Sequence, residues 1–129
     1  MVEVSAAKRN ITPLFPMYMR NKKSIGVLDE LYCRTLVLKI DGIPFIWVTL
    51  DLCRLEEPIS AYMRQVLAAK YSVPMENITI STIHTHSGPD ISFEDEGEDR
   101  NRRKANYRDY MIRQVFASVD QCFDQSFLE

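Results

Sequence analysis

The sequence predicts a mixed α/β fold, in which one β-sheet contains a β-hairpin and a right-handed βαβ unit and helices pack on the sheet. Two apolar runs at residues 31–40 and 45–50 flank Asp41 and Gly42, a pair that favours the tight turn of a hairpin. Residues 45–83 follow the pattern strand, helix, strand, and a crossover of that length makes the two strands parallel. The sheet is therefore expected to be mixed.

A first strand is expected at the N-terminus, where Val2, Val4 and Ala6 alternate with residues on the other side of the chain. Pro13 ends this region, because proline has no N–H to donate to a sheet ladder. Residues 14–28 show no steady period, so a long surface loop is expected there.

The remaining elements follow from periodicity. The return strand at 45–50 is apolar on both faces, which is typical of a central strand covered on both sides. Apolar residues recur at helical spacing over 58–70, and five β-branched residues in six predict a strand at 78–83. A last helix is expected from Ala105, with one apolar stripe formed by Met111, Ile112, Val115, Phe116, Val119, Cys122 and Phe123.

Residues 92–104 differ in character from the rest of the chain. They hold a dense run of acids followed at once by a run of basic residues. Such blocks of charge are usually solvated, and they offer few apolar groups to offset the entropy of ordering. We expect a flexible charged segment, with an acidic site for a cation or a basic partner as the alternative.

Composition limits the class of protein. The 129 residues are the length of a single domain, 1–129, and 46% apolar and 26% charged residues are ordinary for a soluble globular chain. Sixteen basic against eighteen acidic residues argue against a nucleic-acid partner. No apolar run, Pro44–Val48 included, is long enough for a transmembrane segment. Three widely spaced cysteines and no signal peptide indicate a reduced, cytoplasmic protein.

The candidate chemistry lies where two parallel strands are expected to end. His84 and His86 directly follow the strand at 78–83, and Asp51 directly follows its parallel partner. Ligands of open α/β sheets bind beyond the carboxyl ends of such strands. Two imidazoles two residues apart can bind one metal ion, or one can bind metal while the other contacts substrate. Asp51 is a candidate to orient a histidine or contact the metal, because a charge after an apolar strand needs a partner.

Each of these residues also has a structural interpretation. An arbitrary His-x-His pair is more often two polar residues in a loop, and Asp51 equally fits a cap on the following turn. Cys53 lies near Asp51 and can be a nucleophile or a soft metal ligand, but a free cysteine is more often an inert, buried side chain. Two histidines and one carboxylate are also few for a catalytic zinc site, which needs three protein ligands.

The motif resembles a known family. The run from Asn77 to Pro89, which contains His84-Thr85-His86-Ser87-Gly88-Pro89, is similar to the signature region of neutral/alkaline (non-lysosomal) ceramidases, with Ile83 in place of the family's threonine. Three upstream blocks are similar in the same order: 10–13, 26–38 and 48–51. Together these blocks cover most of residues 2–90, and residues 91–129 resemble nothing in the family.

The resemblance implies a zinc-dependent amidohydrolase that cleaves the N-acyl bond of ceramide. It implies that His84 is a Zn²⁺ ligand and that His86 lies beside the metal, where it contacts the lipid or small-molecule amide substrate or the bound water. The family's other metal ligands come from much later in a longer chain, and this chain has no later histidine. We therefore expect these residues to be the N-terminal part of a larger hydrolase, incomplete alone.

Two other functions remain open. The chain can be a stand-alone domain that keeps the fold without the chemistry and serves as a binding or assembly module. It can also belong to a related hydrolase that acts on another amide or ester. A homo-oligomer that completes the site between subunits is a further alternative.

Overall fold

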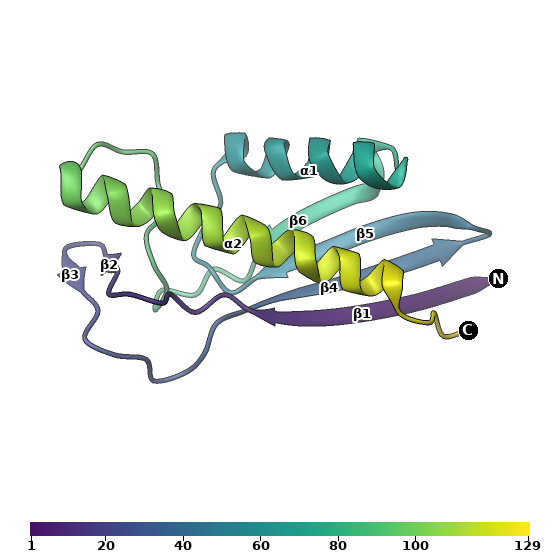
Figure 1. Cartoon of the computed structure of the whole chain (residues 1–129), viewed down its shortest axis with the longest axis horizontal. Coiled ribbons are helices and arrows are strands. Elements are labelled where there is room, and N and C mark those ends of the chain that lie inside the picture. Colours follow the sequence, from purple (N-terminus) through teal and green to yellow (C-terminus); the bar gives the residue numbers. More distant parts are fainter.

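The computed structural model describes residues 1–129, and it is a mixed α/β fold as the sequence predicts. Its main sheet has four strands in the order β1-β4-β5-β6 (Figure 1). Strands β1, β4 and β5 pair antiparallel, and β6 runs parallel to β5. The strands are β1 (Val2–Asn10), β4 (Tyr32–Ile40), β5 (Ile43–Leu50) and β6 (Ile78–Thr82). The predicted hairpin and the predicted parallel pair are both confirmed.

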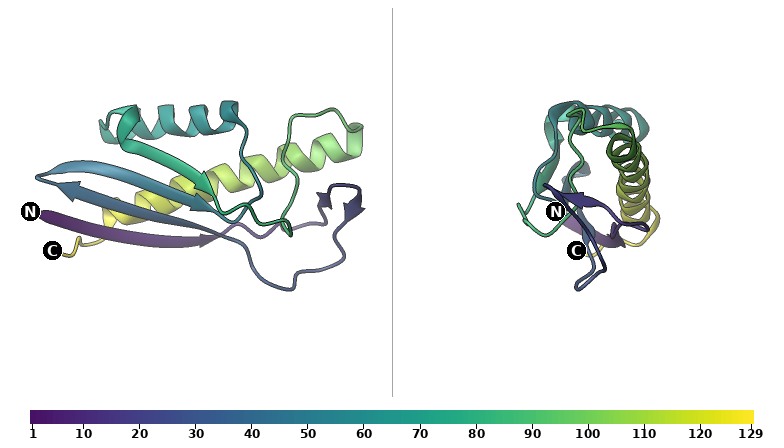
Figure 2. Two further views of the ribbon diagram at one scale, coloured as in Figure 1. Left: turned by 180° about the vertical axis from the view of Figure 1, so that it is seen from behind. Right: turned by 90° about the vertical axis from the view of Figure 1, so that its left-hand side faces the viewer.

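Two helices lie on one face of this sheet, as the end-on view shows (Figure 2, right). Helix α1 (Glu57–Tyr71) connects β5 to β6 and is followed by a single 3₁₀ turn, η1 (Met75–Asn77). Helix α2 (Glu98–Asp124) crosses β1 and β4. The loop expected over residues 14–28 holds a small two-stranded sheet of β2 (Tyr18–Met19) and β3 (Lys22–Lys23). No helix of the structure is both long and apolar enough to span a membrane.

The core fills the space between the helices and the sheet. Odd-numbered residues of β4 and even-numbered residues of β5 point into it, so that Val37, Val48 and Leu50 are fully buried. Met111 and Val115 of α2 are also fully buried, in the apolar stripe that the sequence predicts. One polar contact lies inside this layer, where the hydroxyl groups of Thr35 and Ser118 are 2.5 Å apart.

The other face of the sheet carries no helix, and this corrects one prediction. Strand β5 was expected to be covered on both sides because its residues are apolar on both faces. Its outward residues Phe45 and Trp47 are instead 37% and 55% exposed, since α1 and α2 pack on the same side (Figure 2, left). The residues of β5 are apolar on both faces, but the two helices cover only one of them.

Helix α2 begins at Glu98, seven residues before the predicted start at Ala105. The charged run forms helix because its acids and bases are complementary. Glu98 and Asp99 occupy the first turn, where the helix dipole favours negative charge. Asp99 then pairs with Arg103 one turn later, at 3.0 Å. Helical spacing of opposite charges stabilises the helix in this segment, which composition alone predicts to be a flexible charged segment.

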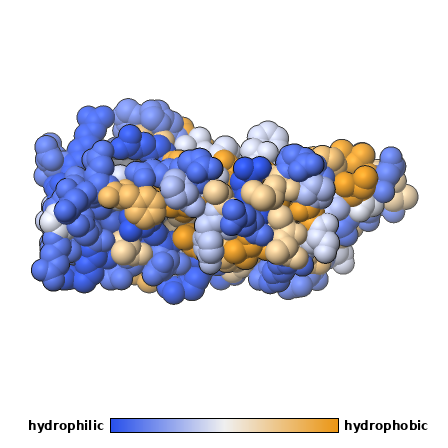
Figure 3. All heavy atoms as spheres, turned by 90° about the horizontal axis from the view of Figure 1, so that it is seen from above, coloured by the Kyte–Doolittle hydropathy of each residue, from blue (hydrophilic) through white to orange (hydrophobic).

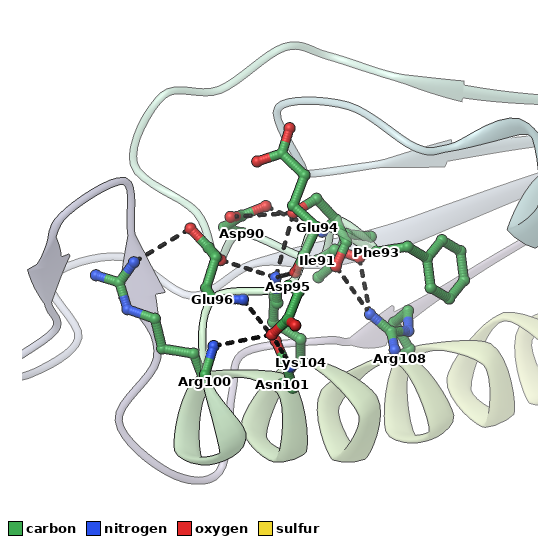
Figure 4. A network of polar contacts seen from close by, with 12 residues as sticks. Asp90, Ile91, Phe93, Glu94, Asp95, Glu96, Arg100, Asn101, Lys104 and Arg108 are labelled. Carbon is green, nitrogen blue, oxygen red and sulfur yellow. Dashed lines mark hydrogen bonds and ion pairs between the residues drawn. The ribbon is translucent and has the colours of Figure 1, made fainter.

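The same segment is held by a polar network (Figure 4). The ammonium group of Lys104 is almost completely buried and donates hydrogen bonds to Ser92 Oγ, to the Glu94 carbonyl and to Glu96 Oε2 at 3.4, 2.6 and 2.7 Å. Arg108 donates to the carbonyls of Ile91 and Ser92, both at 3.1 Å. Residues 92–104 therefore make many polar contacts with the rest of the fold. Their mobility in solution stays a prediction.

This end of the molecule is covered by hydrophilic residues (Figure 3). It contains the beginning of α2 and the small β2–β3 sheet (Figure 1). Tyr18 of β2 lies under the guanidinium group of Arg100, 4.0 Å from ring centroid to the guanidinium carbon. Charged groups at this end pair with one another, as in the Arg100–Glu96 and Lys104–Glu96 ion pairs.

Candidate functional site

The carboxyl ends of β5 and β6 lie together, as the parallel pairing predicts. Leu50 is opposite Thr82 in the last pair of the ladder. Beyond the strands, the N–H of Ile83 donates to the Leu50 carbonyl and the N–H of His84 donates to the Leu52 carbonyl, each at 3.1 Å. The segments after the two strands thus run side by side, and they bring the predicted site residues to one edge of the sheet.

The two imidazoles lie close together because the chain bends at His84. Strand β6 ends at Thr82, so extended geometry with its period of two does not reach His84. His84 has a φ of 64°, in the left-handed region that side chains rarely adopt. The resulting bend places its ring centroid 4.7 Å from that of His86, with the rings at 78°. Both side chains are exposed to solvent.

One hydrogen bond fixes the proton of His84. Its Nδ1 lies 2.7 Å from the backbone carbonyl oxygen of Cys53. A carbonyl oxygen only accepts, so Nδ1 is the donor and carries a proton. In the neutral ring the lone pair is then on Nε2, which leaves that nitrogen free to bind a metal. A backbone carbonyl on the other ring nitrogen is the usual way in which a metal-binding histidine is oriented.

Cys53 also brings a thiol close to the pair. Ligand atoms of Cys53, His84 and His86 all lie within 4.8 Å of one another. Imidazole nitrogen and thiolate sulfur are ligands that zinc prefers, so the donor set fits this metal. The Cys53 Sγ, however, is 3.6 Å from His84 Nδ1, the nitrogen that its own carbonyl already occupies. The geometry therefore favours His84 Nε2 as a ligand, with the Cys53 backbone as its support.

Asp51 is at the predicted edge, but its carboxylate is bonded elsewhere. One oxygen accepts from Arg34 Nη1 at 2.7 Å and the other from the backbone N–H of Tyr32 at 2.9 Å. The residue is 6% exposed and has no hydrogen bond with either imidazole. Asp51 thus holds the end of β5 to the beginning of β4. Its predicted role in orienting a histidine has no contact to support it.

Sequence reasoning missed Arg34 as the partner of Asp51. The signal was present, because the hairpin register pairs Arg34 with Thr49, two residues before Asp51. A cation on the neighbouring strand is a nearer partner for a buried carboxylate than a histidine on a following loop. The ion pair with Arg34 gives the Asp51 carboxylate the partner that the sequence predicts it needs, but this partner is an arginine and not a histidine.

The loop that holds the histidines has one internal hydrogen bond and is tied to two other parts of the fold. The backbone N–H of Ser87 donates to Thr85 Oγ1 at 3.3 Å. The N–H of Asp90 donates to the Tyr18 carbonyl of β2 at 2.9 Å. Ser92 Oγ then accepts a hydrogen bond from Lys104 of α2 at 3.4 Å. The C-terminal end of the histidine loop is thereby anchored to β2 and α2, and its beginning is held by the bond from the His84 N–H to the Leu52 carbonyl.

Two hollows of the surface lie away from the histidines. One is over β1, β4 and β5, with Ala6 and Trp47 in its lining, and another is over the end of α2, with Asp120 and Asp124. Neither includes His84 or His86. The two imidazoles form an open site on the edge of the sheet.

No family model and no curated protein matches this sequence. Two solved structures do match the fold. A ceramidase complexed with C2 aligns with a TM-score of 0.71 at 19% identity, over 96% of this chain and 21% of that chain. Neutral ceramidase from Pseudomonas aeruginosa aligns with a TM-score of 0.72 at 19% identity, over 96% of this chain and 22% of that chain.

These matches confirm the resemblance to neutral ceramidases at the level of the fold. They extend beyond the sequence blocks, because the alignments cover 96% of the chain and so include most of residues 91–129, which resemble nothing by sequence. The chain spans about a fifth of the length of the two structures.

Proposed function

We propose that this chain forms the N-terminal part of a zinc-dependent, ceramidase-like amidohydrolase that acts on the N-acyl bond of ceramide or a related amide. The observation that carries the proposal is the pair of imidazoles at the carboxyl end of β6, one of them with its Nε2 left free by the bond to Cys53. The likeness of the fold to ceramidases supports the choice of substrate class.

His84 would hold the metal through Nε2, and its protonated Nδ1 remains bonded to the Cys53 carbonyl. Bound zinc supplies a Lewis acid and lowers the pKa of a water molecule, which is the chemistry that amide hydrolysis needs. His86 would hydrogen-bond the substrate or a water molecule beside the metal, a role supported by the 4.7 Å between its ring centroid and that of His84. Asp51 acts at a distance by fixing the strand end through Arg34.

The site is incomplete within these residues. Two imidazoles leave at least one ligand position of a catalytic zinc site to be filled. We propose that further ligands come from a longer form of the protein, in which these 129 residues are one part. The chain by itself should then bind zinc weakly.

The test measures zinc affinity by competition with a chromophoric chelator, beside hydrolysis of a fluorogenic N-acyl lipid by the longest natural form of the protein. His84→Ala should remove both metal and hydrolysis. His86→Ala should reduce hydrolysis more than zinc affinity. Cys53→Ser is the matched control, because it removes the thiol and keeps the backbone carbonyl that orients His84.

Three results would contradict the proposal. Stoichiometric zinc in His84→Ala would exclude His84 as a ligand. Loss of zinc in Cys53→Ser would show that the thiol, and not the carbonyl, holds the metal. Hydrolysis that persists without either imidazole would place the active site elsewhere.

A further inference from the structure

The residues that follow β5 hold His84 through backbone carbonyls. The His84 N–H donates to the Leu52 carbonyl at 3.1 Å, and Nδ1 of its ring donates to the Cys53 carbonyl at 2.7 Å. The hydroxyl of Thr82 also donates to the Cys53 carbonyl, at 3.4 Å. The direction of the His84 ring therefore depends on where these two carbonyls lie.

The position of the two carbonyls is set at Asp51, the residue just before them. Its backbone N–H donates to the Tyr32 carbonyl at 3.0 Å, and one of its carboxylate oxygens accepts from the Tyr32 N–H at 2.9 Å. The other oxygen accepts from Nη1 of Arg34 at 2.7 Å. The side chain of Asp51 is only 9% exposed, so salt and water screen this ion pair less than a pair on the surface.

The loop that carries His86 returns to the same residue. A Cβ at Gly88 would lie 3.6 Å from the Asp51 carbonyl oxygen and 3.7 Å from Cδ1 of Leu31. The backbone of the loop is therefore in contact with the backbone of Asp51. A shift of Asp51 would move both imidazoles, because His84 is bonded to the carbonyls after it and the loop of His86 packs on it.

We propose that Arg34 is a positioning residue of the candidate zinc site. Arg34 fixes Asp51, and the carbonyls that follow Asp51 hold the ring of His84 with a proton on Nδ1 and a lone pair on Nε2. The hydrogen bond on one ring nitrogen decides which nitrogen is free for a metal. The inference rests on the function proposed above, in which His84 Nε2 binds the zinc. Arg34 lies on β4 and has no hydrogen bond to either imidazole, so it acts only through Asp51.

A purely structural interpretation of the ion pair makes a different prediction. If the pair only ties β4 to β5, the ring of His84 keeps its bond to the Cys53 carbonyl in every folded variant. If the pair positions the ring, loss of Arg34 lets the carbonyls after Asp51 move. The proton on Nδ1 is then held less well, and the two tautomers of the neutral ring mix.

The tautomer is measured first, by long-range ¹H–¹⁵N NMR correlations of the 129-residue chain without metal. The measurement is made at about pH 8.5, where a histidine of ordinary pKa is neutral. The chain has two histidines, so His86→Gln assigns both sets of signals. We expect a single tautomer in the wild type, with its proton on Nδ1 of His84, and a mixture of the two in Arg34→Gln.

Two further variants show whether the charge at this position is responsible. Arg34→Lys should restore the single tautomer, because the ion pair uses one nitrogen of the guanidinium group. Lys8→Gln is the matched control. Lys8 is a cation opposite Arg34 on β1, and it has no hydrogen bond to Asp51. Its removal should leave the tautomer of His84 unchanged.

The second measurement is zinc affinity, by chelator competition in the longest natural form of the protein. Arg34→Gln should bind zinc about 10-fold more weakly, the low end of the effect of groups that orient a metal ligand. Hydrolysis should recover at saturating zinc, because Arg34 acts on the ligand and not on the substrate. The double variant of Arg34→Gln and Asp51→Asn should bind zinc no more weakly than Asp51→Asn alone, since the effect passes through Asp51.

Four results would overturn the proposal. They are a mixture of tautomers in the wild type, a single tautomer that persists in Arg34→Gln, an equal mixture in Lys8→Gln, and hydrolysis that stays low in Arg34→Gln at saturating zinc. Circular dichroism checks that each variant is folded. Asp51→Asn keeps the size of the side chain and tests the same link if Arg34→Gln does not fold.

Failure of the proposed function gives a different pattern. The tautomer of His84 then changes in Arg34→Gln, while zinc affinity and hydrolysis stay at their wild-type values. That result would support the positioning of the ring by Arg34 and exclude His84 as the zinc ligand.

Discussion

The two faces of the sheet are built from the same strands but have opposite surroundings. On one face Val37, Val48 and Leu50 are fully buried under α1 and α2. On the other face, residues one position along the same strands remain exposed, up to 55% for Trp47. The side chains of both faces are largely apolar, so the difference does not come from composition. It comes from which face the two helices can reach.

This contrast shows that the stability contributed by an apolar residue depends on its surroundings as well as on its type. Burial stabilises the fold only where a partner surface removes water. The covered face should therefore account for most of the stability of the chain, and the open face should tolerate substitution until a partner covers it. The following predictions compare matched positions on the two sides.

The largest difference is expected between Leu50→Ala and Phe45→Ala. Leu50 is fully buried, so its truncation leaves a cavity and should lower the free energy of unfolding by about 2–5 kcal/mol. Phe45 is already partly in water, and its truncation should cost about 1 kcal/mol. Urea unfolding at low protein concentration measures both. Equal losses would show that the open face is covered in solution.

A second comparison sets a buried cation against an exposed one. Lys104→Met removes three hydrogen bonds of a buried ammonium group and should cost about 1.5–3 kcal/mol. Lys70→Met removes a surface pair with Asp120 and should cost less than about 1 kcal/mol. Thermal unfolding of both variants tests this. If Lys104→Met is as stable as the wild type, residues 92–104 are mobile in solution as the sequence first indicated.

A smaller effect distinguishes two threonines on neighbouring strands. Thr35→Val deletes the buried hydroxyl contact with Ser118 and should cost about 1 kcal/mol, because Ser118 keeps its bond to the Val115 carbonyl. Thr49→Val deletes a 3.3 Å contact with Ser81 on the open face, where water can replace the lost hydroxyl. It should change the free energy of unfolding by only a few tenths of about 1 kcal/mol. A double-mutant cycle with Ser118→Ala isolates the buried pair. Similar losses at both threonines would contradict the comparison.

The sequence predicted the elements that local signals specify. Asp41 and Gly42 set the hairpin, and apolar periodicity set α1 and the parallel strand β6. The position of the histidines at the carboxyl end of β6 followed from the same pattern. These features depend on residues close in the chain, which is why they could be derived without the fold.

Contacts between distant residues could not be derived in the same way. The partner of Asp51 lies on β4, and the sequence requires a partner without naming it. The same is true of Lys104, whose burial depends on the loop at Ser92 and Glu94 folding back on α2. An apolar strand likewise predicts a cover for each face without saying whether the chain contains one.

A last comparison uses the chemical reactivity of the three cysteines. It probes the buried layer under the covered face and the candidate site without changing the fold. Cys33 and Cys122 are fully buried, and burial raises the pKa of both thiols, for Cys122 to about 11. A raised pKa leaves less thiolate, the reactive form, at pH 8. Cys53 is only partly buried beside His84, so it should react first with a small alkylating reagent. Mass spectrometry of the intact protein should show one fast addition, assigned to Cys53 by its loss in Cys53→Ser. Fast modification of Cys33 or Cys122 would mean that the layer between α2 and the sheet opens readily. The covered and the open face of the sheet would then differ less in solvent access than their burial indicates.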